Sequence, residues 1–178
     1  MSTIETQTTQ IPAGTYAADP AHSSAEFAVS HMNISTVHGH FTTFEASLDG
    51  GSEPRISATI QVDSATTLDE TRDGHLKSPD FFDTERFPTA TFSGTLVAPD
   101  RIEGELTLKG VTKPIEMKAT TFGPATDPWG NERVGLDLES TVNRNDFGVS
   151  WNLDLPTGGK LLDDSVTLIA SLSFVKQA

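Results

Sequence analysis

Apolar and polar residues alternate along every long apolar stretch of this 178-residue chain. The residues between the apolar positions are mostly Ser, Thr, Glu, Lys and Gln, and the clearest stretches cover residues 25–31, 56–62, 90–96, 102–108 and 166–174. Alternation over five or more residues indicates a β-strand with one dry face and one wet face. Many such strands without a long helix between them predict one sheet curled around a shared interior.

About eight strands are expected, or nine if the first short one is counted separately. We place them at residues 15–18, 23–31, 37–48, 55–62, 89–97, 101–109, 114–122, 132–141 and 166–175. Turn-forming residues separate them, as at Asp49-Gly50-Gly51 and Lys109-Gly110. Pro114 is expected to open its strand, where a missing N–H costs least. The pattern predicts an all-β protein.

The dry faces carry unusually many small residues, among them Ala58, Gly94 and Gly104. A packed core normally favours Leu, Ile and Val, so small inward residues leave room inside. We therefore expect an apolar container. Enlarging Ala58 to Phe or Gly94 to Leu is expected to close its lumen.

Two segments do not alternate, and both are expected to connect strands. In residues 63–88, Thr71 is a suitable N-cap and Pro79 stops continuation, which predicts a short helix over residues 72–78. A further turn is expected at residues 80–83. Residues 143–164 are rich in Asn, Asp, Pro and Gly. Residues 1–12 are interpreted as a flexible N-terminal tail and residues 13–178 as a single domain.

Composition narrows the classes of partner. The chain is 35% hydrophobic and 21% charged, as in globular proteins, and its formal net charge is −13. That charge repels phosphate backbones and anionic membrane surfaces, so we expect no nucleic-acid partner. No run of 18 apolar residues exists, so no stable membrane insertion is expected. The N-terminal residues lack the basic and apolar regions of a signal peptide, which predicts a cytoplasmic location.

The histidines give little evidence for a metal site or a catalytic site. His38 and His40 share the strand face opposite Val37 and Phe41, so a solvated pair is expected rather than a metal site. His31 continues the inward phase of its strand at one end. Its imidazole is expected either to meet a polar group on a ligand or to bond to backbone carbonyls. The absence of Cys excludes disulfides and thiolate metal sites, and we expect no metal.

No motif of an enzyme is found. The chain lacks a Gly-x-Ser-x-Gly elbow and a glycine-rich phosphate loop, and its paired carboxylates lie in segments typical of caps and turns. Arg144, one of 12 basic residues against 25 acidic ones, has two interpretations. It serves either as a hook for a polar head group or as a lock on a carboxylate such as Asp146 or one within residues 72–83.

Several segments together resemble the YceI-like family of lipocalin-like, polyisoprenoid-binding proteins. The most specific segment is Arg72-Asp73-Gly74-His75-Leu76-Lys77-Ser78-Pro79-Asp80-Phe81-Phe82-Asp83, followed by Phe87-Pro88-Thr89-Ala90. Residues 19–23, 27–32, 37–41, 104–114 and 144–148 support it, and the resemblance extends from Gly14 to Phe174. Five such segments in order are far more specific than any one alone.

The resemblance implies an elongated, eight-stranded antiparallel barrel with a short helix near one end. Its lumen would hold a long isoprenoid lipid, a polyprenyl quinone or polyprenyl phosphate, with no other cofactor. The implied role is that of a non-enzymatic carrier, store or sequestering protein. Many relatives carry a secretory leader, and this chain departs from them in that respect. A homodimer is compatible with a β-rich chain, but the sequence gives no further argument for one.

Strand phase provides the residues expected to line the lumen and bind the lipid. These are Phe27, Val29, His31, Phe41, Phe44, Ile60, Phe92, Leu106, Met117, Leu136, Leu138, Leu168 and Leu172. A lid or gate is expected from His75, Leu76, Phe81 and Phe82. Two alternatives remain open. One is an enzyme that uses His31 or His75 as a general base on a lumen-bound substrate, and the other is a filled barrel that serves as a structural or interaction module.

Overall fold

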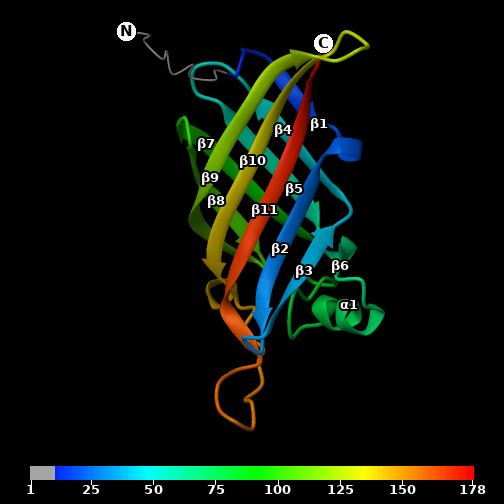
Figure 1. The fold of residues 1–178 in the computed structure, drawn as a ribbon, viewed down its shortest axis with the longest axis vertical. Coiled ribbons are helices and arrows are strands. Elements are labelled where there is room, and N and C mark those ends of the chain that lie inside the picture. The colour runs from blue at the N-terminus through cyan, green and yellow to red at the C-terminus, as the bar shows by residue number, and fades with distance from the viewer. Residues whose placement is uncertain (1–10) are drawn as a thin grey trace.

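The computed structural model describes residues 11–178 (Figure 1). The tail expected at residues 1–12 falls outside this range except for its last two residues, and these belong to the domain. Ile11 is buried in the core, and the carbonyl of Pro12 accepts a hydrogen bond from the Tyr16 hydroxyl at 3.2 Å. The domain therefore includes residues 11 and 12 and does not begin at residue 13.

Antiparallel strand segments form one closed sheet. In chain order they are β1 (Thr15–Ala18), β2 (Ser24–His31), β3 (Ser35–Phe41), β4 (Phe44–Asp49), β5 (Arg55–Gln61), β6 (Ala65–Thr66), β7 (Thr89–Ala98), β8 (Arg101–Leu108), β9 (Val111–Thr126), β10 (Glu132–Asn143) and β11 (Leu162–Lys176). Each pairs with its neighbours in an up-and-down order, and β1 also pairs with β11, which closes the ring.

The ring is an eight-stranded barrel because three of its strands are each broken into two segments. A short 3-10 helix, Pro20–His22, separates β1 from β2, and a second one, Val62–Ser64, separates β5 from β6. Thr42 and Thr43 separate β3 from β4, so the strand expected at residues 37–48 is interrupted. The expected all-β, eight-stranded antiparallel barrel is confirmed, and Figure 1 shows that the barrel is elongated along its strands.

The one α-helix in the described part of the chain, α1 (Glu70–Lys77), lies beside one end of the barrel (Figure 1). It begins two residues before the expected start. Asp69, and not Thr71, is the N-cap, and its carboxylate accepts a hydrogen bond from the Arg72 N–H at 2.8 Å. An Asp side chain at the extended position before a helix satisfies a free N–H of the first turn. The helix ends at Lys77, and Pro79 follows its C-cap as expected.

Pro114 lies inside β9 and not at its start, which corrects the expectation from sequence. It pairs with Glu105 on β8. The ladder between β9 and β10 covers only Lys118 to Thr126 on the β9 side, so the other edge of β9 is unpaired at Pro114. An unpaired edge tolerates a residue without an N–H.

None of the helices in residues 11–178 is long and apolar enough to cross a membrane.

Candidate functional site

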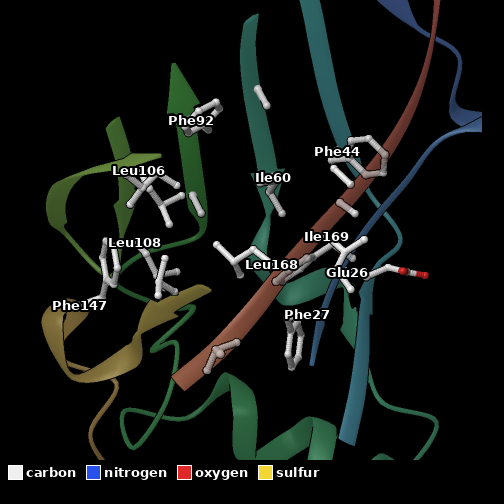
Figure 2. Close-up of a pocket in the computed structure, with 18 of the residues that line it drawn as sticks. Glu26, Phe27, Phe44, Ile60, Phe92, Leu106, Leu108, Phe147, Leu168 and Ile169 are labelled. Atoms are coloured by element: carbon white, nitrogen blue, oxygen red, sulfur yellow. The ribbon is translucent and has the colours of Figure 1, made fainter. Parts of the chain in front are cut away.

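A cavity of about 190 Å³ lies inside the barrel, and Figure 2 shows side chains from several strands converging on it. It has 30 lining residues, and 28 of them are apolar. The two exceptions are Glu26 and Arg144. Figure 2 shows Glu26 and Ile169 on the opposite side of their strands from Leu168, so the Glu26 carboxylate points away from the interior. Such a lining suits an apolar ligand.

Eleven of the thirteen residues expected in the lumen line this cavity. They are Phe27, Val29, Phe41, Phe44, Ile60, Phe92, Leu106, Met117, Leu138, Leu168 and Leu172. His31 and Leu136 are not part of the lining. His31 is the last residue of β2 and pairs with Ser35 and Leu162, while Leu136 is 1% exposed within the packed core. Whether any of the thirteen contacts a lipid stays a prediction.

Strand phase could also have identified further lining residues that were not predicted individually, such as Ala46, Ile56 and Val166. Each continues the inward alternation of its strand. Phe147 and Val149 could not be found in this way. They come from the irregular segment between β10 and β11, where a 3-10 helix, Arg144–Phe147, turns the chain inward.

The inward glycines do not create the cavity, and the expectation that they leave room is wrong. A Cβ added to Gly94 would lie 2.8 Å from Cζ of Phe92, and one added to Gly104 would lie 2.9 Å from the same atom. The glycines therefore make space for a neighbouring aromatic ring, and Gly94→Leu would collide with that ring rather than close an open lumen. Ala58, in contrast, does line the cavity.

The end of the barrel next to β1 is filled by side chains. Tyr16, Leu48, Ile102 and Phe174 are all 2% exposed or less and lie outside the cavity lining. The Tyr16 hydroxyl donates a hydrogen bond to a Glu132 carboxylate oxygen at 3.0 Å. Burial raises the pKa of Tyr16, and the hydrogen bond to Glu132 raises it further. This end of the barrel is therefore packed with side chains and is not part of the cavity.

Aromatic side chains cover the opposite end of the cavity. Phe81 and Phe82, expected in a lid, are each 8% exposed and line the cavity together with Leu76. The ring of Phe82 lies 6.1 Å from those of Phe27 and Phe41. His75 is not part of the lining. Its ring packs edge-on against Phe81 at 4.9 Å and against Trp151 at 4.7 Å, and its Nε2 lies 2.9 Å from Asp80 Oδ2.

Polar contacts attach the lid segment, which comprises α1 and the following residues 78–83, to the barrel. No residue of α1 is buried. Asp73 Oδ1 accepts hydrogen bonds from the N–H and hydroxyl of Thr67 at 2.7 and 2.6 Å, and Arg72 Nη2 donates to the Thr67 carbonyl at 2.9 Å. Burial raises the pKa of Asp73, but the hydrogen bonds from Thr67 and Thr66 and the charge of Arg72 outweigh it, so the pKa is lowered.

Arg144 is neither locked to a carboxylate of the expected kind nor exposed. Its side chain is held by backbone carbonyls: Nε donates to Asp163 at 2.8 Å, and Nη1 donates to Val149 at 2.7 Å and to Trp151 at 2.9 Å. Nη2 makes no hydrogen bond and lies 3.8 Å from Asp164 Oδ1. Burial lowers the pKa of Arg144, against the opposing charge of Asp164. Arg144 thus clamps two stretches of backbone together, residues 149–151 and the start of β11.

The two neighbouring histidines lie on the outer face of β3, as strand phase predicts. His38 is exposed, and His40 Nδ1 lies 2.9 Å from Glu26 Oε1 on the adjacent strand. His40 and Glu26 are direct cross-strand partners. His40 therefore has an ion-pair partner on the surface of the barrel.

Besides the interior cavity, the structure has an opening in the barrel wall. It lies at the break between β1 and β2, next to the break between β3 and β4. Its volume is about 600 Å³, and it shares Ala25, Phe41 and Phe44 with the interior cavity. Its full lining is Pro20, Ser23, Ser24, Ala25, His40, Phe41, Thr42, Thr43, Phe44, Glu45, Thr66 and Leu68. Sequence reasoning missed it. The available signals were Pro20 between two apolar runs and the Thr42-Thr43 pair, which breaks the alternation.

Comparison with known proteins gives consistent matches across the chain. The model of the YceI-like domain matches residues 16–174. A UPF0312 protein of Staphylococcus aureus strain N315 is 37% identical over 161 residues, covering 88% of this chain and 94% of the relative.

Solved structures with the same fold include proteins from three bacteria. BcnA of Burkholderia cenocepacia aligns with a TM-score of 0.74 at 22% identity, over 88% of this chain and 98% of its own. The Campylobacter jejuni YceI protein aligns with a TM-score of 0.68 at 26% identity, over 84% and 90%. A polyisoprenoid binding domain from Saccharophagus degradans aligns with a TM-score of 0.67 at 14% identity, over 93% and 100%.

Proposed function

Because this chain belongs to the YceI-like family, we propose that its interior cavity binds the hydrocarbon chain of a long polyisoprenoid lipid. The observation that carries the proposal is the lining of the cavity, 28 of whose 30 residues are apolar. A cavity with this lining inside a closed barrel excludes water from a slender apolar ligand. The Saccharophagus degradans neighbour is described as a polyisoprenoid binding domain, and this supports the same ligand class here.

The energetics of burial favour a long chain. Each buried CH₂ contributes roughly 0.8 kcal/mol, so a forty-carbon chain would nominally give about 30 kcal/mol. That total exceeds the practical ceiling for non-covalent affinity, near about 20 kcal/mol. Immobilising many torsions and displacing side chains must offset part of it. We therefore expect the length of the cavity to select the lipid more sharply than the summed contact area does.

The proposed role is that of a carrier, store or sequestering protein and not of an enzyme. Within the described lining, the only ionisable side chains are Glu26, which points outward, and Arg144, which is held by backbone carbonyls. His75, the alternative general base, packs between Phe81 and Trp151 behind the lining. This arrangement supports binding, because acid–base catalysis needs a titratable group within reach of the substrate.

A matched pair of variants on β5 tests the proposal. Ala58 lines the cavity, whereas the next residue, Thr59, is exposed on the outer face. Ala58→Phe should reduce uptake of a radiolabelled polyprenyl quinone at least tenfold, and Thr59→Phe should leave uptake unchanged. Circular dichroism and size-exclusion chromatography check that both variants are folded. Equal uptake by the two folded variants would place the lipid outside this cavity and overturn the proposal.

A further inference from the structure

The opening in the barrel wall exists because two neighbouring strands break at the same level. The ladder between β1 and β4 ends at the pair Ala17 and Ser47, and the ladder between β2 and β3 begins only at Glu26 and His40. Asp19 caps the intervening 3-10 helix by accepting a hydrogen bond from the Ala21 N–H at 3.0 Å. The backbone on each side of the opening is therefore diverted into local structure and does not close the wall.

The opening adjoins the cavity. Ala25, Phe41 and Phe44 line both spaces, so a chain in the cavity would have to pass or displace these three side chains to place its end in the opening. The end next to β1 is packed with side chains such as Tyr16 and Phe174, which are 0% exposed. The wall between the broken strands is consequently where the apolar interior meets polar side chains and solvent.

The chemistry of the opening suits an uncharged polar group. Its lining includes the hydroxyl-bearing residues Ser24, Thr43 and Thr66, and it includes no Lys or Arg among the residues that the structure describes. Glu45 is exposed there without an ion-pair partner in residues 11–178, and the His40 imidazole is already engaged by Glu26. A phosphate would meet this negative charge and the chain's overall charge of −13 without a compensating cation.

We propose that the opening in the barrel wall holds the polar head of the bound lipid, and that this head is an uncharged hydrogen-bonding group such as a quinone ring. The inference rests on the proposed function, because it places the head of the lipid whose chain fills the cavity. It distinguishes a polyprenyl quinone from a polyprenyl phosphate.

The competing place for the head is the lid end, where Arg144 is the one cation of the described cavity lining. Three of its five N–H groups are already donated to backbone carbonyls, and the two on Nη2 make no hydrogen bond, with the Asp164 carboxylate 3.8 Å from that nitrogen. Arg144 therefore has local partners that account for most of its hydrogen-bonding capacity and part of its charge. The Thr66 hydroxyl donates to Asp73 Oδ2 at 3.1 Å, which leaves the Ser24 and Thr43 hydroxyls as the donors that the described part of the opening offers, with room around them. The opening is therefore the better site for an uncharged head.

Fluorescence quenching locates the head directly, because a quinone quenches a dye only at close range. The chain has no Cys, so Leu68→Cys and Ser150→Cys each give a single site for a thiol-reactive dye. Leu68 is 89% exposed at the rim of the opening, and Ser150 lies between two residues whose carbonyls bind Arg144. Bound polyprenyl quinone should quench the dye at position 68 several-fold more than the dye at position 150. A polyprenyl alcohol of equal length is the control for the chain. Equal quenching, or stronger quenching at position 150, overturns the placement.

Affinity measurements then test the chemical class. The wild-type protein should bind a polyprenyl quinone roughly tenfold more tightly than a polyprenyl monophosphate of equal length, a difference of about 1.4 kcal/mol in binding free energy. Glu45→Lys should narrow that ratio, whereas Glu105→Lys, an exposed residue on β8 across the barrel, should not. A phosphate that binds wild type as tightly as the quinone overturns the inference and leaves the proposed function intact. If neither lipid binds, the proposed function itself fails.

Discussion

The ring of Phe27 on β2 lies directly over Gly39 on β3, its cross-strand partner. A Cβ added to Gly39 would lie 2.1 Å from Cζ of Phe27, and the same ring also contacts Phe41 and Phe82, with centroid distances of 5.5 and 6.1 Å. The glycine therefore fixes the position of the ring that joins the barrel wall to the lid. Covering a strand glycine with a neighbouring aromatic ring is a recognised way to fix strand register.

Gly39→Ala should destabilise the protein by about 1–3 kcal/mol, the usual cost of inserting an extra group into a packed interior. Urea unfolding followed by Trp fluorescence measures the change. Gly74→Ala is the matched control, because a Cβ there meets nothing within 4 Å and the residue lies in α1. It should stabilise the protein by roughly 0.5–1 kcal/mol through helix propensity. Similar stability in the two variants would show that Phe27 does not depend on the glycine.

Phe82→Ala should loosen the lid. The side chain is 8% exposed and packs against two rings of the barrel wall. Its removal should lower the free energy of unfolding by about 3–5 kcal/mol if this segment unfolds together with the rest of the domain. A smaller loss of global stability combined with faster lipid release would show that the segment opens locally. Stopped-flow transfer of a polyprenyl quinone to vesicles gives the release rate. Unchanged release in a folded Phe82→Ala protein would exclude this segment as a gate.

Asp73 makes the attachment of α1 sensitive to acid. Its pKa is lowered in the folded protein, below the value of about 3.9 for an unfolded Asp. The stability that it contributes is therefore present above about pH 4 and is lost as the pH falls through the folded-state pKa. Asp73→Asn should lower stability at pH 7 and reduce the slope of unfolding free energy against pH below about pH 4. Urea titrations across that range measure both, and parallel pH curves for the two proteins would contradict the assignment.

Arg144 should be essential to the irregular segment. Arg144→Gln removes the donors for three backbone carbonyls and should cost about 3 kcal/mol or more, because buried acceptors lose their partners. Arg144→Lys should not restore stability, since an ammonium group cannot reproduce the planar fork. Arg55→Gln is the control, because Arg55 is largely exposed with a single 3.9 Å contact to Glu53. A loss below about 0.5 kcal/mol for Arg144→Gln, within the usual range of surface substitutions, would reject the clamp.

Strand phase predicted the fold and most of the cavity, because alternation determines which face of a strand points inward. It could not show which ring fills the space beside Gly104, since Phe92 lies on the neighbouring strand and its position depends on cross-strand register. The same limit explains Leu136, which has the correct phase but lies in the packed core. Phe147 and Val149 come from a segment without alternation, so their position depends on tertiary contacts that Arg144 organises.

The opening in the wall was also beyond strand phase. In the sequence, a break in one strand indicates only a local turn. The two breaks lie side by side because β1 pairs with β4 and β2 pairs with β3, and strand phase does not give this pairing. The position of α1 was nearly correct because cap residues and Pro79 define a helix locally. Asp69 was missed as the cap because Thr71 is also a suitable residue type and sequence alone does not give backbone angles.

Organic extraction of the freshly purified protein, followed by mass spectrometry, tests most directly whether the cavity holds an isoprenoid. We expect one polyprenyl lipid per protein chain, and its mass identifies both the chain length and the head group. Wild type that yields no such lipid, and that takes up neither polyprenyl quinone nor polyprenyl phosphate when incubated with them, would contradict the account and favour a barrel filled by its own side chains.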